Sequence, residues 1–247
     1  MQSIFERYEK KYLITEQQHK ALERTMSQHM VPDVHGTYLV QNLYYDTEHW
    51  DVIRASLDKP AYKEKMRLRC YGMANKHTDF FLELKKKYKG IVYKRRIAIP
   101  AQAPAESPIR TIVSKLHSQI AGELAFYLQA NNVAEKIYIS YRRTALAGLR
   151  DGGLRITFDT DILFRINNLR FADPHNGQCV LPDGKMLMEI KMLNGMPLWL
   201  AGALSENEIF PTNFSKYGVC YTAYIGKQIQ NNKEGDDLCL PPFQVVS

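Results

Sequence analysis

Apolar and polar positions alternate with a period of two residues along much of this chain, which is typical of β-strands that bury one face. The alternation predicts strands over residues 4–14, 38–46, 62–72, 79–88, 91–100, 135–147, 154–166 and 186–193. Lys89-Gly90 is a plausible hairpin turn between the fourth and the fifth of them. Since most strands follow one another without an intervening helix, the pattern favours an antiparallel sheet or barrel over a parallel sheet.

Helical patterns occupy several of the remaining segments. Thr15, with Gln18 three residues later, forms a capping box that begins a helix ending near Met30. Further helices are predicted at about 48–57, 109–130 (one helix or two), 198–207 and 215–228, and loops at 101–108 and 167–185. The fold class is therefore α+β, with one domain over residues 1–228 and a tail over 229–247 that is either disordered or strapped to the surface.

The polar side of the predicted strands is mostly cationic, which a solvated sheet face does not require. In the third strand, Lys65, Arg67 and Arg69 share one face, with Met66 and Leu68 on the other. The other charged faces hold Arg7, Glu9 and Lys11; Glu83, Lys85 and Lys87; Lys94 and Arg96; Tyr141 and Arg143; Arg155, Thr157 and Asp159; and Glu189 and Lys191. Like charges on neighbouring strands repel, so this density of cations is tolerable when an anion lies between them.

The charge balance locates the basic excess on these faces. The chain has 33 Lys and Arg against 26 Asp and Glu, a net charge of +7. The faces above, together with Lys216, hold thirteen of the cations and only four of the acids, so the rest of the chain is close to neutral. A closed barrel turns such faces all outward or all inward. We predict that they point inward and form a cationic tunnel, with the apolar faces packed outward under the helices.

Other classes of protein fit the sequence less well. No run of 18 apolar residues is present to span a bilayer, and MQSIFERYEKK carries charges where a signal peptide is apolar. The four cysteines lack CxxC spacing and the seven histidines lack metal-ligand spacing. These features favour free thiols in the cytoplasm and argue against a disulfide framework or a zinc site.

Nine short motifs together resemble the polyphosphate polymerase domain of the vacuolar transporter chaperone (VTC) family, over about residues 3–228. They are RxExKY (7–12), NLYYDT (42–47), KxRxRxYG (65–72), LELKKK (82–87), KRR (94–96), YRRTAL (141–146), LRITFDTDI (154–162), MEIKML (188–193) and FSKYG (214–218). That family belongs to the triphosphate tunnel metalloenzymes, also called CYTH-like. The resemblance implies an eight-stranded antiparallel β-tunnel with helices packed outside.

The resemblance also implies an activity and a set of site residues. The activity is transfer of the terminal phosphate of ATP to a growing polyphosphate chain with Mn²⁺ or Mg²⁺, and the partners are ATP, triphosphate or polyphosphate. Catalytic roles fall to Lys11, Arg67, Arg69, Arg143, Arg155 and Lys191; substrate binding to Lys65, Lys85, Lys87, Lys94, Arg96, Ser215 and Lys216; and metal binding to Glu189 and Glu9. Ser215 and Lys216 begin a predicted helix, whose free N–H groups favour an anion at the tunnel mouth.

Two other functions stay open. A tripolyphosphatase or nucleoside triphosphatase has the same fold, although Arg7 replaces the first Glu of the ExExK motif found in the hydrolase branches. A non-catalytic polyanion-binding module is the second, but the cations alternate along strands, so nucleic acid is not the expected partner.

Several residues have structural interpretations. We predict that Asp46 caps a turn, that Asp159 and Glu83 hold neighbouring cations in place, and that Trp50 and Trp199 are packing anchors.

Overall fold

The computed structural model describes residues 8–89, 91–100, 107–193 and 195–233, and it contains the predicted strands and helices. The strands are β1 (Tyr8–Thr15), β2 (Met30–Asp46), β3 (Tyr62–Tyr71), β4 (Phe80–Tyr88), β5 (Ile91–Ile99), β6 (Ala134–Gly148), β7 (Arg155–Arg165), β8 (Gln178–Cys179) and β9 (Lys185–Met192). The helices are α1 (Glu16–Met26), α2 (Asp51–Leu57), α4 (Ile109–Ser114), α5 (Gln119–Ala130), α6 (Leu198–Glu206) and α7 (Lys216–Lys233). α7 thus includes residues 229–233, where a tail was predicted; Arg7 and residues 234–247 lie outside the described residues.

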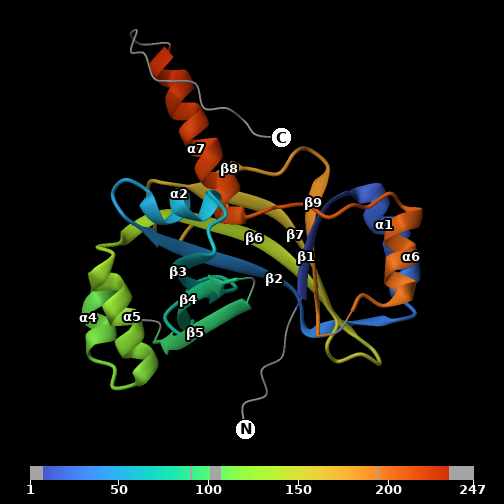
Figure 1. Cartoon of the computed structure of the whole chain (residues 1–247), viewed down its shortest axis with the longest axis horizontal. Coiled ribbons are helices and arrows are strands. Elements are labelled where there is room, and N and C mark those ends of the chain that lie inside the picture. Colours follow the sequence, from blue (N-terminus) through green and yellow to red (C-terminus); the bar gives the residue numbers. More distant parts are fainter. Residues whose placement is uncertain (1–7, 90, 101–106, 194, 234–247) are drawn as a thin grey trace.

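The strands form one antiparallel sheet in the order β1-β9-β7-β6-β2-β3-β4-β5, with the short β8 paired to β7 (Figure 1). The predicted antiparallel arrangement is therefore confirmed. β1 and β5 are the edge strands, and within the described parts of the chain they are not paired with each other. Within the residues that the structure describes, the sheet is therefore not closed into a barrel by hydrogen bonds.

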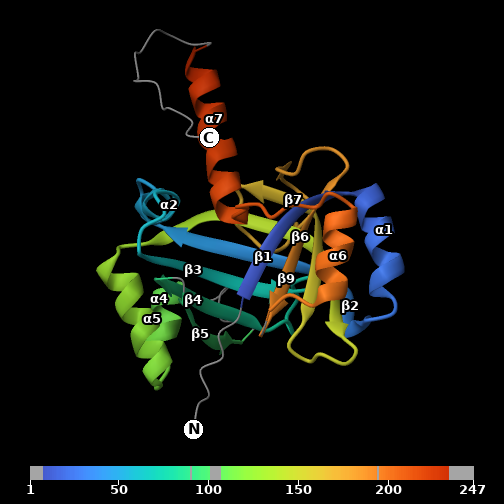
Figure 2. The same ribbon diagram turned by 45° about the vertical axis from the view of Figure 1, so that its right-hand side comes forward.

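Helices cover the apolar face of the sheet at both ends of the strand order. α4 and α5 contribute to a core cluster that includes Leu68 and Leu82, and α1 and α6 to a second cluster that includes Ile156 and Ile190. Figures 1 and 2 show these helix pairs on opposite sides of the molecule. The apolar strand faces thus pack outward under helices, as predicted, and this burial supplies the main stabilising term.

The capping box of α1 is present. The Gln18 N–H donates to Thr15 Oγ1 at 3.1 Å, and the Thr15 N–H donates to Gln18 Oε1 at 3.0 Å. The helix ends at Met26, earlier than predicted, because β2 begins at Met30. A register shift between Pro32 and Thr37 interrupts the alternation of this early part of β2, which hid it from the pattern.

The first turn of α7 packs against the polar face of the sheet rather than its outer face. Tyr217 stacks on Tyr44 at 4.6 Å between ring centroids and lies in a cluster with Ile137, Ile139 and Leu187. Since Tyr44 and Arg67 are direct cross-strand partners, they share one face of the sheet. α7 therefore covers one end of the polar face.

Asp46 fixes the turn from β2 into α2. It accepts hydrogen bonds from the N–H groups of Thr47, Val52 and Ile53 and from the Tyr217 hydroxyl. Its predicted turn-capping role is confirmed, and the same carboxylate ties α7 to the sheet. Trp50 packs beside Tyr221 of α7, as expected of a packing anchor.

Candidate functional site

Cross-strand register gathers the predicted cations into rows on one face. Lys65 lies opposite Lys85, which lies opposite Lys94. The next row of the same face holds Arg67, Glu83 and Arg96. Residues directly opposite each other in an antiparallel pair point to the same side, so β3, β4 and β5 present these charges together.

The polar face is concave, because side chains from strands that are not neighbours meet across it. Arg69 of β3 donates from Nη2 to the Tyr141 hydroxyl of β6 at 3.1 Å, over the intervening β2. Lys65 of β3 donates to Ser215 Oγ at 3.2 Å, next to the start of α7. Burial raises the pKa of Glu9 on β1, but the positive charges of Lys85 on β4 and of Lys11 outweigh this effect, so that the pKa is lowered overall. The two ends of the sheet therefore approach each other around this face.

Four buried charges at the centre hold one another. Arg143 grips Asp159 with Nε and Nη2 at 2.6 and 2.7 Å, and Lys216 Nζ lies 2.5 Å from the same carboxylate. Glu189 accepts from Lys216 at 2.8 Å and from Arg143 at 3.2 Å. Asp159 thus holds neighbouring cations, as predicted. Lys216, predicted at an open mouth, is instead buried between two carboxylates supplied by β7 and β9.

Arg69 is a buried guanidinium held by uncharged groups. Its Nε donates to Asn42 Oδ1 at 2.8 Å, and its second contact is the Tyr141 phenol. Within the described residues no carboxylate lies within 4.0 Å of it. Burial raises the pKa of Tyr141, but Arg69, Arg143 and Lys216 outweigh this, so that pKa is lowered overall. The potential at the centre of the face is therefore positive.

Glu83 neutralises part of the β3–β5 wall. Its oxygens lie 2.8 Å from Arg67 Nη2, 2.6 Å from Lys94 Nζ and 3.6 Å from Arg96 Nε. Burial raises the pKa of this carboxyl, but Arg67 and the other cations lower it to about 2. Its predicted role of holding cations in place is confirmed.

Several lysines on the same face have no carboxylate within 4.0 Å in the described part of the chain, and four of them also have a lowered pKa: Lys63, Lys65, Lys85 and Lys191. Burial lowers the pKa of each of them. For Lys65, burial and the charges of Lys63, Lys11 and Lys85 lower the pKa to about 7. Burial and mutual repulsion disfavour the charged form of these lysines. An anion that binds among them stabilises the charged form.

This arrangement predicts a pH dependence of anion binding. A bound phosphate chain raises the pKa of Lys65 above its free-state value of about 7, so binding takes up a proton above that pH. We expect the affinity for long-chain polyphosphate, whose internal phosphates stay ionised, to fall about tenfold between pH 7 and 8.5 and to change little below pH 6. Calorimetric titration measures it.

Two variants separate this effect from a general loss of charge. Lys65→Met should flatten the pH profile. Lys86→Met is the matched control, since Lys86 lies on the outer face of the adjacent strand and pairs with Glu64 at 3.3 Å. A Lys65→Met profile as steep as that of the wild-type protein would show that another group titrates.

Lys11 stands between the two predicted metal ligands. Its Nζ donates to the Phe214 carbonyl at 2.9 Å and lies 3.5 Å from Glu9 Oε1 and 3.8 Å from Glu189 Oε1. In the described residues no three His, Cys, Asp or Glu side chains cluster as a metal site. Two carboxylates beside a cluster of cations nevertheless fit a hard cation that takes its remaining ligands from oxygens of a bound anion.

The remaining predicted residues lie around this centre. Arg155 is at the rim, where Nη2 lies 2.5 Å from Asp33 Oδ2. Lys87 lies opposite Lys63 near the end of β4. Ser215 caps α7, since its Oγ accepts the Gly218 N–H at 3.2 Å. The predicted start of this helix is therefore confirmed.

Comparison with known families decides the relationship. The model of the VTC domain matches residues 6–225. This chain belongs to the VTC domain family. A comparison of the VTC domain chain with curated proteins found no match.

Solved structures were compared with this VTC domain, and one of them supports its fold. A Hippeastrum protein described as a putative adenylyl cyclase, HpAC1, with a dominant triphosphatase activity superposes with a TM-score of 0.52 at 19% identity, covering 87% of this chain and 95% of its own. A putative adenylate cyclase from Bacillus halodurans gives a TM-score of 0.49 at 13% identity, covering 84% and 92% of the two chains. At this level of identity the first likeness supports the fold.

Sequence reasoning missed some polar residues of the VTC domain face. Lys63 shares the alternation of Lys65 and was detectable from it. Asn42, which accepts a hydrogen bond from Arg69, is uncharged and therefore gave no signal in the charge pattern. Thr157 was placed on this face by the alternation but was given no role; it lies opposite Glu189, and within the described residues its buried hydroxyl has no hydrogen-bond partner. Asp33, the partner of Arg155, lies in the irregular start of β2 and gave no periodic signal.

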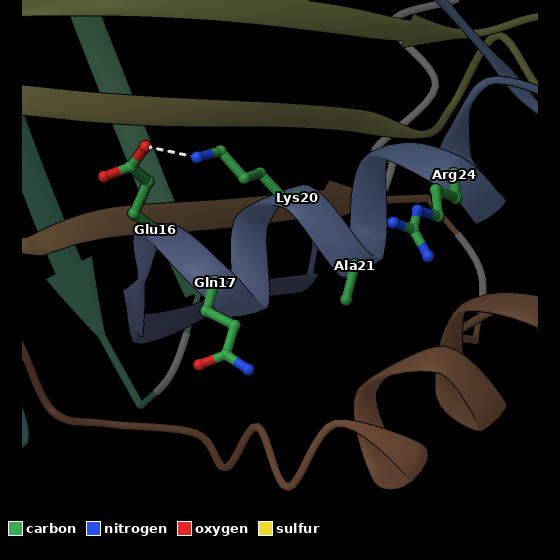
Figure 3. Close-up of a pocket in the computed structure, with 5 residues that line it drawn as sticks. All are labelled: Glu16, Gln17, Lys20, Ala21 and Arg24. Carbon is green, nitrogen blue, oxygen red and sulfur yellow. Dashed lines mark ion pairs between the residues drawn. The ribbon is translucent and has the colours of Figure 1, made fainter.

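A depression on the exposed side of α1 is separate from this face of the VTC domain. Glu16, Gln17, Lys20, Ala21 and Arg24 line it, and Figure 3 shows the Glu16–Lys20 ion pair at its edge. Its residues come from consecutive turns of one helix, and it does not share the cation excess of the concave face.

None of the helices in the described part of the chain has the length and hydropathy of a transmembrane segment.

Proposed function

We propose that this VTC domain binds a phosphate chain on its concave face and transfers the terminal phosphate of ATP to a growing polyphosphate chain. The observation that supports this most is the charge imbalance of the face. Its described cations are Lys11, Lys63, Lys65, Arg67, Arg69, Lys85, Lys87, Lys94, Arg96, Arg143, Arg155, Lys191 and Lys216, against the carboxylates Glu9, Asp33, Glu83, Asp159 and Glu189. A phosphate chain supplies the missing negative charge at a regular spacing.

The proposed mechanism is mainly electrostatic. Arg67, Arg69 and Arg143 present planar guanidinium forks to phosphate oxygens, and Lys11 and Lys191 act as point charges on bridging or leaving oxygens. Phosphoryl transfer depends on in-line positioning and on stabilising charge in the transition state, rather than on covalent chemistry by the protein. Asp159 is a positioning residue, because it holds Arg143 and Lys216 without facing substrate.

Glu189 and Glu9 would hold Mn²⁺ or Mg²⁺ together with substrate phosphate oxygens. Both oxygens of Glu189 already contact cations, so we expect the protein to take up the metal only with a phosphate chain. The metal would supply positive charge that neutralises part of the charge of the phosphate chain. We place the activity in the cytoplasm, which agrees with the free thiols of Cys70, Cys179 and Cys220.

Hydrolysis of a triphosphate is the second candidate function. It is favoured by α7, which covers one end of the concave face and leaves a growing chain less room there. Synthesis is favoured by Lys63 of β3 and Lys87 of β4, which extend the cationic rows to that end of the face, and by β1 and β5, which are not hydrogen-bonded to each other in the described residues.

Analysis of reaction products distinguishes the candidates. We expect the protein incubated with ATP and Mn²⁺ to form chains that resolve as a polyphosphate ladder on a gel, and Glu189→Gln to lose this activity. Arg142→Met, on the outer face of β6, is the matched control and should behave as wild type. Free phosphate without chains would favour the triphosphatase, and neither product would favour a non-catalytic polyanion-binding module.

A further inference from the structure

Three aromatic side chains line the polar face at the end away from α7. Phe81 is the direct cross-strand partner of Arg69, Tyr71 lies two residues after Arg69 on β3, and Tyr38 is the partner of Arg143. The ring centroids are 5.9 Å apart for Tyr38–Tyr71 and for Tyr71–Phe81. Tyr71 is 37% exposed, and Tyr38 and Phe81 are half-buried. We call these three residues the ring cluster.

Guanidinium groups of the phosphate-binding face adjoin the ring cluster. The Arg96 guanidinium carbon lies 3.6 Å from the Phe81 centroid and 5.8 Å from that of Tyr71. Arg69 also lies 5.8 Å from the Tyr71 centroid. A ligand that contacts the Tyr71 ring therefore lies beside the buried Arg69.

Solvent-accessible rings need an explanation at this position. A phosphate chain has no apolar surface. In a face that bound only phosphate, Ser, Thr or Asn side chains beside the arginines would be sufficient to donate hydrogen bonds to it. Tyr44 and Tyr141, which lie on the same face, are buried near α7. Accessible aromatic surface within the described part of this face is thus concentrated at the end away from α7, where one end of a ligand would leave the cationic centre.

We propose that the ring cluster, with Arg96, is the subsite for the base of a nucleoside triphosphate. This inference rests on the proposed function. Bases stack on aromatic rings and on guanidinium planes, and the triphosphate then extends past Arg69 and Arg143 toward Lys11 and Glu189. The subsite gives the substrate a direction, with the base on the ring cluster and the terminal phosphate nearer α7. Stacking contacts the flat face of a base and not the hydrogen-bonding groups at its edge. We therefore expect ATP and GTP to bind with similar affinity.

Comparison of ATP with inorganic triphosphate tests this subsite, because only ATP has a base. We expect Phe81→Leu and Tyr71→Leu each to weaken ATP binding about tenfold in calorimetric titrations with Mn²⁺, and to change triphosphate binding less than twofold. Tyr88→Leu is the matched control, since Tyr88 is 45% exposed on the outer face of the same strand as Phe81.

The other outcomes overturn the inference in distinct ways. Equal losses for both ligands would mean that the rings only support Arg96 and Arg69. No loss for either ligand would mean that the rings do not contact the substrate. Failure of the wild-type protein to bind triphosphate would overturn the proposed function itself. Urea unfolding of each variant identifies any that loses affinity by failing to fold, and the two substitutions report independently.

Discussion

Asp159→Asn is expected to lower the free energy of unfolding by about 3–5 kcal/mol, the loss typical when one partner of a buried ion pair is removed. The carboxylate is fully buried and contacts both Arg143 and Lys216. An amide of the same shape leaves those two cations buried beside each other with only Glu189 to balance them. The loss should therefore arise from uncompensated charge rather than from altered packing.

Urea denaturation measures this loss, and the same strand offers a control. Asp161→Asn is a chemically identical change two residues along β7, at an exposed position, and should alter the unfolding free energy by no more than about 0.5 kcal/mol. A loss below about 1 kcal/mol for Asp159→Asn would contradict the role assigned to this carboxylate. Adding triphosphate should restore part of the lost stability, because the ligand binds the folded state.

The cations of the concave face fall into two groups with different consequences. Arg67, Arg143, Lys94 and Lys216 contact carboxylates within 3.0 Å and belong to the folded framework as well as to the polar face. Arg69 and Lys65 have no carboxylate within 4.0 Å in the described part of the chain, so they keep their attraction for a ligand. Burying such unpaired charges disfavours folding, and the apolar clusters under the helices offset this.

Much of the fold was predictable because local pattern decides it. The period of two placed β3, β4 and β5 and identified the side of each that carries charge, and the Thr15–Gln18 pair placed the start of α1. The start of β2 was missed because Pro32 and the following irregular residues break the alternation. Alternation reports which residues share a face, and it carries no information about strand order.

The remaining features of the site depend on contacts between distant segments. Lys216 was predicted at a mouth from its place at a helix start, but two carboxylates far away in the sequence draw it into the centre. Arg155 was assigned to the phosphate clamp, and the structure places it at the rim beside Asp33, 122 residues away. Nor does any pattern in the sequence show that the described parts of β1 and β5 do not pair with each other or that α7 packs on the polar face.

Arg69→Met is expected to separate binding from stability. The guanidinium makes charge-assisted hydrogen bonds to a bound phosphate, each worth about 1.5–3 kcal/mol, so affinity for inorganic triphosphate should fall about 10²- to 10³-fold. The unfolding free energy should change by only about 1 kcal/mol, because losing the contacts to Asn42 and Tyr141 is offset by removing a buried cation without a carboxylate partner. This is the reverse of the balance expected for Asp159→Asn.

Calorimetric titration of inorganic triphosphate into the wild-type protein, Arg69→Met and Arg142→Met therefore tests most directly whether the concave face is an anion site. Arg142 lies next to Arg143 on β6 but on the exposed outer face, so both substitutions remove the same charge. The account predicts binding by the wild-type protein and by Arg142→Met, weakened at high salt, and a loss of at least about 10²-fold for Arg69→Met. Equal affinities for all three proteins, or no binding by the wild-type protein, would contradict it.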